Sequence, residues 1–231
     1  MANNYRIKSL IVNSLQHQRQ EYGDQNAGFT MAEMIVVLLM IGILSVIAAP
    51  GWSAFINRQR LNQANGAVAS VIQETRLQAK STKGTYSISF RVNNNIPEYI
   101  IYPGIPTTTP ITNPPANSVW IALGDTMTLR SREVFLYTNL NPLTEYNTTT
   151  ADRQIVQTTL GTGTITFDSQ GVLAKKSSGA VSDTPLAIMV AAPVSTNDTA
   201  SSVDRCVIIQ TLIGGIRIAK DERCRTIPTN E

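Results

Sequence analysis

An uncharged apolar run near the N-terminus constrains this chain more than any other feature. Residues 34–57 contain no Asp, Glu, Lys or Arg, and most residues up to position 49 are Ile, Val, Leu, Met or Ala. A helix rises about 1.5 Å per residue, so roughly 20 residues are enough to cross the hydrocarbon core of a bilayer. The run therefore predicts one membrane-spanning helix, which we place at residues 29–52.

Glu33 lies inside the apolar end of this helix, five residues after Gly28. A carboxylate in a membrane span costs about 2.5–3.5 kcal/mol on insertion scales, so it needs a partner. If the bond between Gly28 and Phe29 is cut, Phe29 gains a charged α-amine four residues from Glu33. The amine of a neighbouring copy could then neutralise the carboxylate, and cleavage would be coupled to assembly.

The segment around these residues resembles the N-terminus of type IV prepilins. In that family a glycine is followed by Phe-Thr, any two residues and Glu, and then by an apolar helix with a proline near its end. The matching positions here are Gly28, Phe29, Thr30, Glu33 and Pro50. The resemblance implies that a prepilin peptidase cuts after Gly28 and methylates the amine of Phe29. The other three positions would serve assembly with further pilin or pseudopilin subunits.

The same resemblance implies how the chain is placed in the cell. Residues 1–28 become a cytoplasmic leader peptide, and residues 29–52 cross the bacterial inner membrane once, in contact with its lipid. The C-terminal domain then lies on the periplasmic side and enters a pilus or pseudopilus with the helix. The flanking charges do not decide this orientation, because Glu21 and Asp24 dilute the basic residues of the leader.

The apolar run has two other interpretations. One is an ordinary single-span anchor in which Glu33 is incidental. The other is a cleaved secretory signal, since Ala48 and Ala49 end the run with small residues. Pro50 follows at once, however, and the polar region before the run is unusually long for a signal peptide. The anchor and the signal are therefore both less favoured than a prepilin.

The helix is expected to continue as an amphipathic segment over residues 53–83. Pro50 lacks an amide hydrogen, so a kink or local melting is expected there. Lys83 and Gly84 resemble a helix end, with cations in the last turn and a glycine beyond. One face of this segment carries a stripe of mostly apolar residues, spaced by three, four or seven positions: Ala54, Leu61, Ala64, Val68, Val71, Thr75 and Ala79.

Short strand patterns follow and predict a β-rich domain over residues 84–231. The candidates are residues 86–92, 99–102, 119–123, 127–129, 134–137, 154–158, 164–167, 172–175 and 186–190, with a turn at 93–95. Polar or proline-rich surface loops are expected at residues 103–115, 144–152 and 195–204. The fold class is therefore α+β: a long N-terminal helix packed on one or two antiparallel sheets, as in pilins.

Residues 206–224 have the pattern of a hairpin that turns at Gly214 and Gly215. A two-residue turn there does not set Cys206 opposite Cys224, so a bulge or a three-residue loop is needed. Two widely spaced cysteines without a nearby histidine favour a disulfide over a metal site in an exported chain. Its closed loop would add about 3 kcal/mol of stability.

The catalytic patterns that we sought are missing from the sequence. There is no Walker-type glycine loop, nucleophile elbow, His-Glu-x-x-His motif or calcium loop. The single histidine, His17, lies in the expected leader, so the mature chain has no histidine as general base or metal ligand. We therefore expect a non-enzymatic protein without cofactor or metal.

Two weaker matches favour one branch of the pilin-like proteins. Residues 59–62 and 165–171 resemble elements of GspH/FimT pseudopilins, which implies a minor pilin or pseudopilin of a type IV pilus or a type II secretion system. Some relatives in this branch bind DNA through a Gly-Arg-x-Arg motif, of which this chain keeps Gly214 and Arg217 but has Gly215 in place of the first arginine. The candidate phosphate contacts are Arg217, Lys220, Arg223 and Arg225.

The charge near the C-terminus does not favour DNA capture. Residues 203–231 carry five basic and four acidic side chains, and the whole chain has a net charge of only +3. Little net field then remains to attract phosphate. A tip subunit that binds DNA is the alternative function, and a lone membrane-anchored domain is the third.

Overall fold

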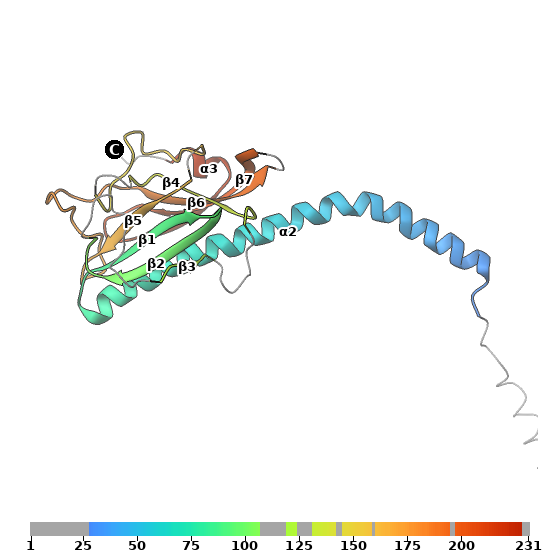
Figure 1. The fold of residues 1–231 in the computed structure, drawn as a ribbon, viewed down its shortest axis with the longest axis horizontal. Coiled ribbons are helices and arrows are strands. Elements are labelled where there is room, and N and C mark those ends of the chain that lie inside the picture. The colour runs from blue at the N-terminus through green and yellow to red at the C-terminus, as the bar shows by residue number, and fades with distance from the viewer. Residues whose placement is uncertain are drawn as a thin grey trace, which may run out of the picture. The chain divides into compact units, whose positions relative to one another are not determined.

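A computed structural model describes residues 28–106, 119–123, 131–141, 145–158, 160–194 and 197–227. The chain divides into two compact units, Met1–Gly51 and Trp52–Glu231. The order of elements is α2 (Met31–Thr82), β1 (Tyr86–Asn93), β2 (Ile96–Pro103), β3 (Ile121–Ala122), β4 (Phe135–Thr138), β5 (Gly163–Phe167), β6 (Leu186–Val194), β7 (Asn197–Ile209), β8 (Ile216–Lys220) and α3 (Glu222–Arg225) (Figure 1). This is the α+β, pilin-like architecture that the sequence predicts.

Helix α2 contributes to both units. Its backbone is helical through position 50, so the local melting expected at Pro50 is wrong. The predicted stripe is buried in the second unit from Leu61 to Ala79, whereas Ala54 is exposed. Thr75 is tolerated in this apolar stripe because its hydroxyl donates to the carbonyl of Val71 at 2.7 Å.

The helix ends one residue before the predicted Lys83–Gly84 pair. Lys83 has a φ of 52°, and it takes the left-handed position that glycine usually fills. The amide of Gly84 donates to Ala79 O at 3.1 Å, and that of Lys83 donates to Lys80 O at 3.4 Å. These two bonds form a Schellman cap, which stops the helix and turns the chain into β1.

Two antiparallel four-stranded sheets follow, in the orders β3-β2-β1-β5 and β4-β6-β7-β8. Strands β1 and β2 form a hairpin from Tyr86↔Pro103 to Asn93↔Ile96. Asn94 and Asn95 have positive φ angles of 49° and 60°, which is the geometry of a type I′ turn. The predicted Asn-rich turn is therefore confirmed.

The main core lies between the second part of α2 and the inner faces of both sheets (Figure 1). Alternate residues of the strands supply it, because successive side chains of a strand point to opposite faces. A second cluster covers the other face of the β4-β6-β7-β8 sheet and includes Phe135, Met189, Cys206 and Ile227. This sheet is consequently buried on both faces.

The outer face of the β1–β5 pair is polar but still buried. Ser87 shares a hydrogen bond with Thr166 at 2.9 Å, and Ser89 shares hydrogen bonds with Thr164 at 2.7 Å and with the hydroxyl of Tyr102 at 3.0 Å. Each buried hydroxyl in this layer therefore has a partner, as buried polar groups require. The small hydroxyl side chains let neighbouring segments approach the sheet closely.

Asn147 joins one of those segments to the sheet. Its side-chain amide donates to Thr166 O and Ala174 O at 2.8 and 2.9 Å, and its Oδ1 accepts from the amide of Thr166 at 2.8 Å. Asn147 is fully buried, within the segment that we predicted to be an exposed loop at 144–152. That prediction is wrong about exposure, although the described part of the segment contains no strand.

Three further predictions about the strands are wrong. Residues 154–158 form no strand, because the side chain of Gln154 rather than a β-ladder bonds to the backbone of Ile227. Residues 172–175 make only one bridge, Phe167↔Leu173. The polar stretch predicted as a loop at 195–204 belongs mostly to β7, because backbone pairing with β6 stabilises a strand whatever its side chains.

Some predictions fall outside the described residues. They are the leader up to residue 27, the strand at 127–129 and the greater part of the proline-rich loop at 103–115.

Candidate functional site

Helix α2 begins with a reciprocal cap between Thr30 and Glu33. The amide and hydroxyl of Thr30 donate to Glu33 Oε2 at 2.8 and 2.9 Å, and the amide of Glu33 donates to Thr30 Oγ1 at 3.2 Å. This is a capping box, in which a threonine at the N-cap and a glutamate three residues later satisfy free helix amides. The two side chains therefore fix where the helix starts, directly after Gly28 and Phe29.

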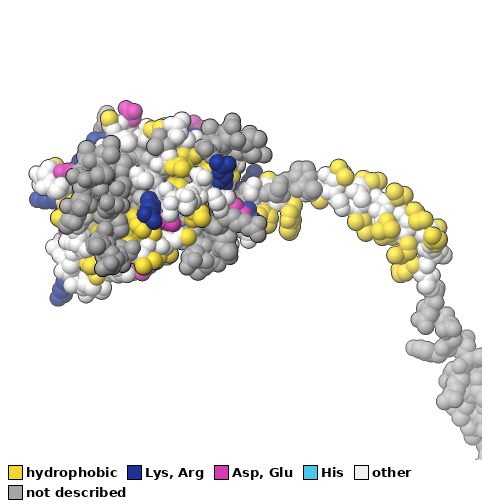
Figure 2. Space-filling model, in the orientation of Figure 1, with side chains coloured by type: hydrophobic (Ala, Val, Ile, Leu, Met, Phe, Trp, Pro, Cys, Tyr) yellow, Lys and Arg dark blue, Asp and Glu magenta, His cyan; other side chains and the backbone are white. Residues whose placement is uncertain are grey.

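The first unit exposes a continuous apolar surface. The large apolar side chains between Met34 and Ile47 are each between 46% and 76% exposed, and Figure 2 shows many of them in yellow along this helix. By length and composition, Met31–Ala48 can cross a membrane, and it is the one helix among the described residues that passes this test. An apolar surface of this extent needs lipid or other protein to cover it.

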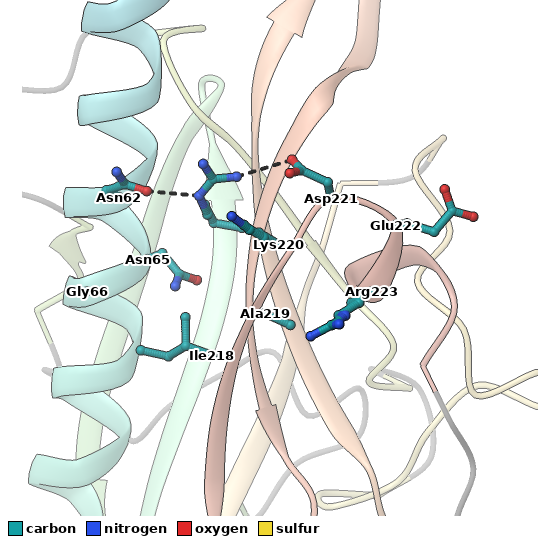
Figure 3. A pocket seen from close by; sticks show the side chains of 10 residues that line it. Asn62, Asn65, Gly66, Ile218, Ala219, Lys220, Asp221, Glu222 and Arg223 are labelled. Carbon is teal, nitrogen blue, oxygen red and sulfur yellow. Dashed lines mark hydrogen bonds and ion pairs between the residues drawn. The ribbon is translucent and has the colours of Figure 1, made fainter.

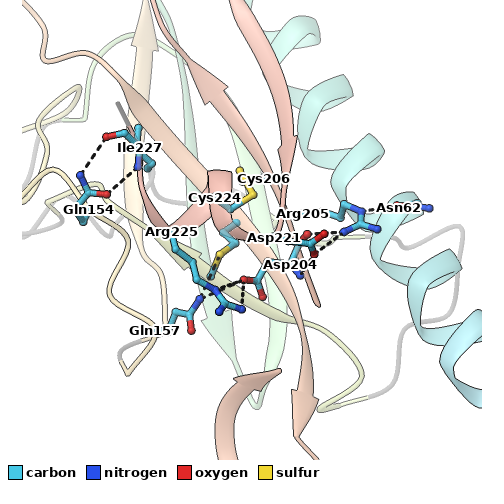
Figure 4. The surroundings of a disulfide bond; sticks show 11 residues. Asn62, Gln154, Gln157, Asp204, Arg205, Cys206, Asp221, Cys224, Arg225 and Ile227 are labelled. Atoms are coloured by element: carbon cyan, nitrogen blue, oxygen red, sulfur yellow. Dashed lines mark hydrogen bonds and ion pairs between the residues drawn. A yellow bond between two sulfur atoms is a disulfide. The ribbon is translucent and has the colours of Figure 1, made fainter. Parts of the chain in front are cut away.

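Cys206 and Cys224 form the predicted disulfide (Figure 4). Their Cα atoms are 5.6 Å apart, and both residues are fully buried in the second cluster. The pairing is confirmed, but the predicted hairpin register is wrong. Cys206 of β7 pairs with Ala219 of β8, and Cys224 lies beyond the hairpin on α3.

The register differs because the hairpin has a longer loop. The last β-pair is Ile209↔Ile216, and a turn is closed by the bond from Gly214 N to Thr211 O at 2.9 Å. Gly214 has a φ of 76°, and a Cβ there would come within 3.3 Å of Arg76 and Phe167. Position 214 therefore needs glycine, as the hairpin pattern predicted. Gly214 lies near the end of a six-residue connection between β7 and β8 rather than in a two-residue turn.

The disulfide holds α3 beside a buried carboxylate, Asp204. The Asp204 side chain is fully buried, and its Oδ2 accepts from Arg225 Nε at 2.7 Å and from Gln157 at 3.4 Å (Figure 4). Burial raises the pKa of Asp204, although the Arg225 guanidinium opposes that shift. The guanidinium of Arg225 therefore neutralises the buried carboxylate of Asp204.

The four candidate phosphate contacts do not share one surface. Arg225 pairs with Asp204, and Arg217 is half-buried. Arg217 and Lys220 are three residues apart on β8, so their side chains point to opposite faces of the strand. Lys220 and Arg223 are exposed and do come together, but Asp221 and Glu222 lie between them.

Lys220 and Arg223 line a groove of about 620 Å³ between α2 and β8 (Figure 3). The wall on the helix consists of Asn62, Asn65 and Gly66, and the other wall is formed by Arg205 and residues 218–223. We call this the α2–β8 groove.

A hydrogen bond of Arg205 links the two walls of the α2–β8 groove, and an ion pair holds Arg205 within its own wall. Arg205 Nε donates to Asn62 Oδ1 at 2.9 Å, and Arg205 Nη1 contacts Asp221 Oδ1 at 3.2 Å (Figures 3 and 4). Sequence reasoning missed the groove, because Asn62 and Arg205 are 143 residues apart in the chain and neither asparagine of the helix wall belongs to a recognisable motif.

The comparisons with known proteins locate one matching region. Residues 24–49 match the family model for the prokaryotic N-terminal methylation motif, which is typical of type IV pilins and pseudopilins. The searches of curated proteins and of solved structures gave no significant match. The matched region contains the Gly28–Glu33 segment, the Thr30–Glu33 cap and the exposed apolar helix. The chain therefore carries the N-terminal methylation motif of a type IV pilin-like precursor, the kind of protein that a prepilin peptidase processes.

Proposed function

We propose that this chain is the precursor of a minor pilin or pseudopilin of GspH/FimT type, and that its work in a type IV pilus or type II secretion pseudopilus is structural. The peptidase cuts after Gly28 and methylates Phe29, so that residues 1–28 are lost. Residues 29–52 then form the membrane and assembly helix, residues 53–83 its amphipathic continuation, and residues 84–231 the periplasmic domain. The observation that carries this proposal is the capped, exposed apolar helix that starts two residues after the cleavage position.

The Thr30–Glu33 cap leaves the carboxylate partly available. Both bonds from Thr30 reach Oε2, and no described residue donates to Oε1. The amine of Phe29 in a neighbouring subunit can therefore approach Oε1 without breaking the cap. In a membrane that interaction relieves the cost of an isolated charge, so it favours a helix that has subunit neighbours over a helix alone in lipid.

The apolar side chains of the helix provide the contact surface. Lipid tails are as apolar as leucine, so helices in a membrane associate through close packing and polar contacts rather than through the hydrophobic effect. When the subunit moves from the bilayer into a filament, neighbouring helices replace lipid around the same side chains. The helix is thus suited both to anchor the precursor in the inner membrane and to form the filament core.

DNA capture by the C-terminal hairpin is not favoured. Arg225 neutralises Asp204, and only Lys220 and Arg223 remain together on an exposed surface. Glu222 reduces their field further, and two cations can neutralise few phosphates.

Photocrosslinking through the apolar helix tests the structural role. With a photoreactive residue in place of Leu39, which is 62% exposed, irradiation of membranes from a host that has the assembly machinery should yield adducts with other pilin-like subunits. The matched control is Val181, which is 59% exposed in the second unit, and it should give few such adducts. If position 39 yields lipid adducts alone, the chain is a lone anchored domain.

A further inference from the structure

Strand β8 is an open edge of its sheet. It pairs with β7 from Ile209↔Ile216 to Arg205↔Lys220, and no described strand pairs with its other side. The bonds at both ends of this ladder, Gln210 N to Gly215 O at 2.9 Å and Asp221 N to Asp204 O at 3.1 Å, fix the hydrogen-bond alternation. With that alternation, every second residue of β8 directs its N–H and C=O away from β7: Ile216, Ile218 and Lys220.

This edge lacks the usual protection against strand pairing. Natural edge strands are commonly blunted by proline, by bulges or by charged side chains along their length. In β8, Ile218 lies at the middle of the edge and is 60% exposed, and the pairing with β7 has no bulge. On the face of β8 that carries Ile218, the charge is at one end, at Lys220, because the Arg217 side chain points to the opposite face.

Asn65 provides a buried hydrogen-bond acceptor at the α2–β8 groove. It lies on the helix wall of the α2–β8 groove and is only 3% exposed, yet its Oδ1 has no hydrogen-bond partner in the described part of the chain. In Figure 3 its side chain lies between α2 and β8, beside Ile218. A buried acceptor without a donor is unfavourable, so an occupant that donates a hydrogen bond there would be stabilised.

The charges of the groove indicate the kind of occupant. Asp221 is already paired with Arg205. Lys220 and Arg223 are exposed and make no ion pair with the described residues, whereas Glu222 is the single free acidic side chain beside them. The unpaired charge of this wall is therefore positive, which favours a carboxylate.

We propose that the α2–β8 groove binds an extended acidic peptide segment of a partner protein, which pairs with β8 and continues the sheet as an added strand. Its backbone bonds to the open edge of β8, a hydroxyl or amide side chain donates to Asn65 Oδ1, and its carboxylates face Lys220 and Arg223. This is recognition by β-strand addition, in which backbone bonds give affinity and side-chain contacts give specificity. The inference does not depend on N-terminal processing.

Synthetic peptides and the full chain in detergent micelles test the proposal. The probe is a fluorescent peptide about seven residues long, which at about 3.3 Å per residue covers the length of β8. Its residues on one face of the strand are threonine and glutamate in turn, and the residues between them are serine, so that hydroxyls and carboxylates face the α2–β8 groove together. Two control peptides have lysine in place of glutamate, or methylated amides on the edge that would face β8. Anisotropy measures binding, and residue-resolved hydrogen exchange locates it. We expect the acidic peptide to bind and the controls to fail.

Hydrogen exchange gives a pattern that non-specific binding would not produce. The acidic peptide should slow exchange at the amides of Ile216, Ile218 and Lys220, and should leave Arg217 and Ala219 unchanged because those two already bond to β7. Lys220→Glu should weaken binding about fivefold, the range of one exposed ion pair, whereas the matched Lys175→Glu should not. Asn65→Leu should weaken binding similarly, and the exposed Lys220 keeps the test decisive if that variant unfolds.

Three results would overturn the proposal. The first is the absence of binding by the acidic peptide, and the second is equal binding by the lysine or methylated peptides. The third is slowed exchange at the three outward amides as the protein concentration rises without peptide, which would assign the edge to a second copy of this chain.

Discussion

A Glu33→Ala variant is expected to enter the membrane at least as well as the wild-type chain, yet to be lost from filaments. Removing the carboxylate removes an insertion cost of about 2.5–3.5 kcal/mol. It also removes the counter-charge for the amine of Phe29 in a neighbouring subunit. Losing about 1.4 kcal/mol of that pairing lowers the binding equilibrium tenfold, so we expect about tenfold or greater loss of incorporation. Immunoblots of sheared filaments and of membranes measure both quantities.

Thr30→Ala is the matched control for the Glu33 experiment. Glu33 also caps α2, so its removal could act by fraying the helix rather than by removing charge. Thr30→Ala deletes the hydroxyl and its two side-chain bonds with Glu33 but keeps the carboxylate. Because it keeps the counter-charge of the amine, it should be lost from filaments much less than Glu33→Ala. If the two variants were lost equally, the cap rather than the charge would explain assembly.

Asn147→Ala is expected to destabilise the β-domain by roughly 3–5 kcal/mol, a large part of the stability of an ordinary domain. The substitution leaves the buried amide of Thr166 without its side-chain partner. It also removes one of the two hydrogen bonds to each of the carbonyls of Thr166 and Ala174, which otherwise accept from Ala174 N and Ser182 Oγ. It also places alanine at a φ of 53°, which asparagine tolerates better. The urea midpoint of the full chain in micelles, followed by tryptophan fluorescence, measures the loss.

Asn93→Ala provides the comparison for Asn147. Asn93 is exposed at the end of β1 and makes one long side-chain bond, to Glu98 at 3.4 Å. Its replacement should change the midpoint little, because water replaces that bond. If Asn147→Ala were as mild as Asn93→Ala, the segment around Asn147 would not be held to the sheet by its side chain.

The N-terminal half of the fold was predictable because local rules govern it. The start of α2 follows from a threonine and a glutamate at capping-box spacing, and its buried face from the stripe between Leu61 and Ala79. The hairpin of β1 and β2 follows from alternation on both sides of an asparagine-rich turn. In each case neighbouring residues in the sequence supply the deciding interactions.

The C-terminal half depended on contacts between distant segments. Cys224 was expected on a strand opposite Cys206, but the six-residue connection shifts the register and places it on α3. The polar start of β7 resembled a loop because its stability comes from backbone pairing with β6. The α2–β8 groove combines residues 62–66 with residues 205–223, and no local pattern links them.

The intact mass of the chain, expressed in membranes with and without a prepilin peptidase, tests the processing at the centre of the proposed function. With the peptidase, we expect the chain to lose residues 1–28 and to begin with Phe29, heavier by one methyl group on its amine. Without the peptidase, the precursor should remain whole. A whole precursor in both samples, or a cut after Ala49 in place of Gly28, would contradict the assignment of this chain as a processed pilin-like subunit.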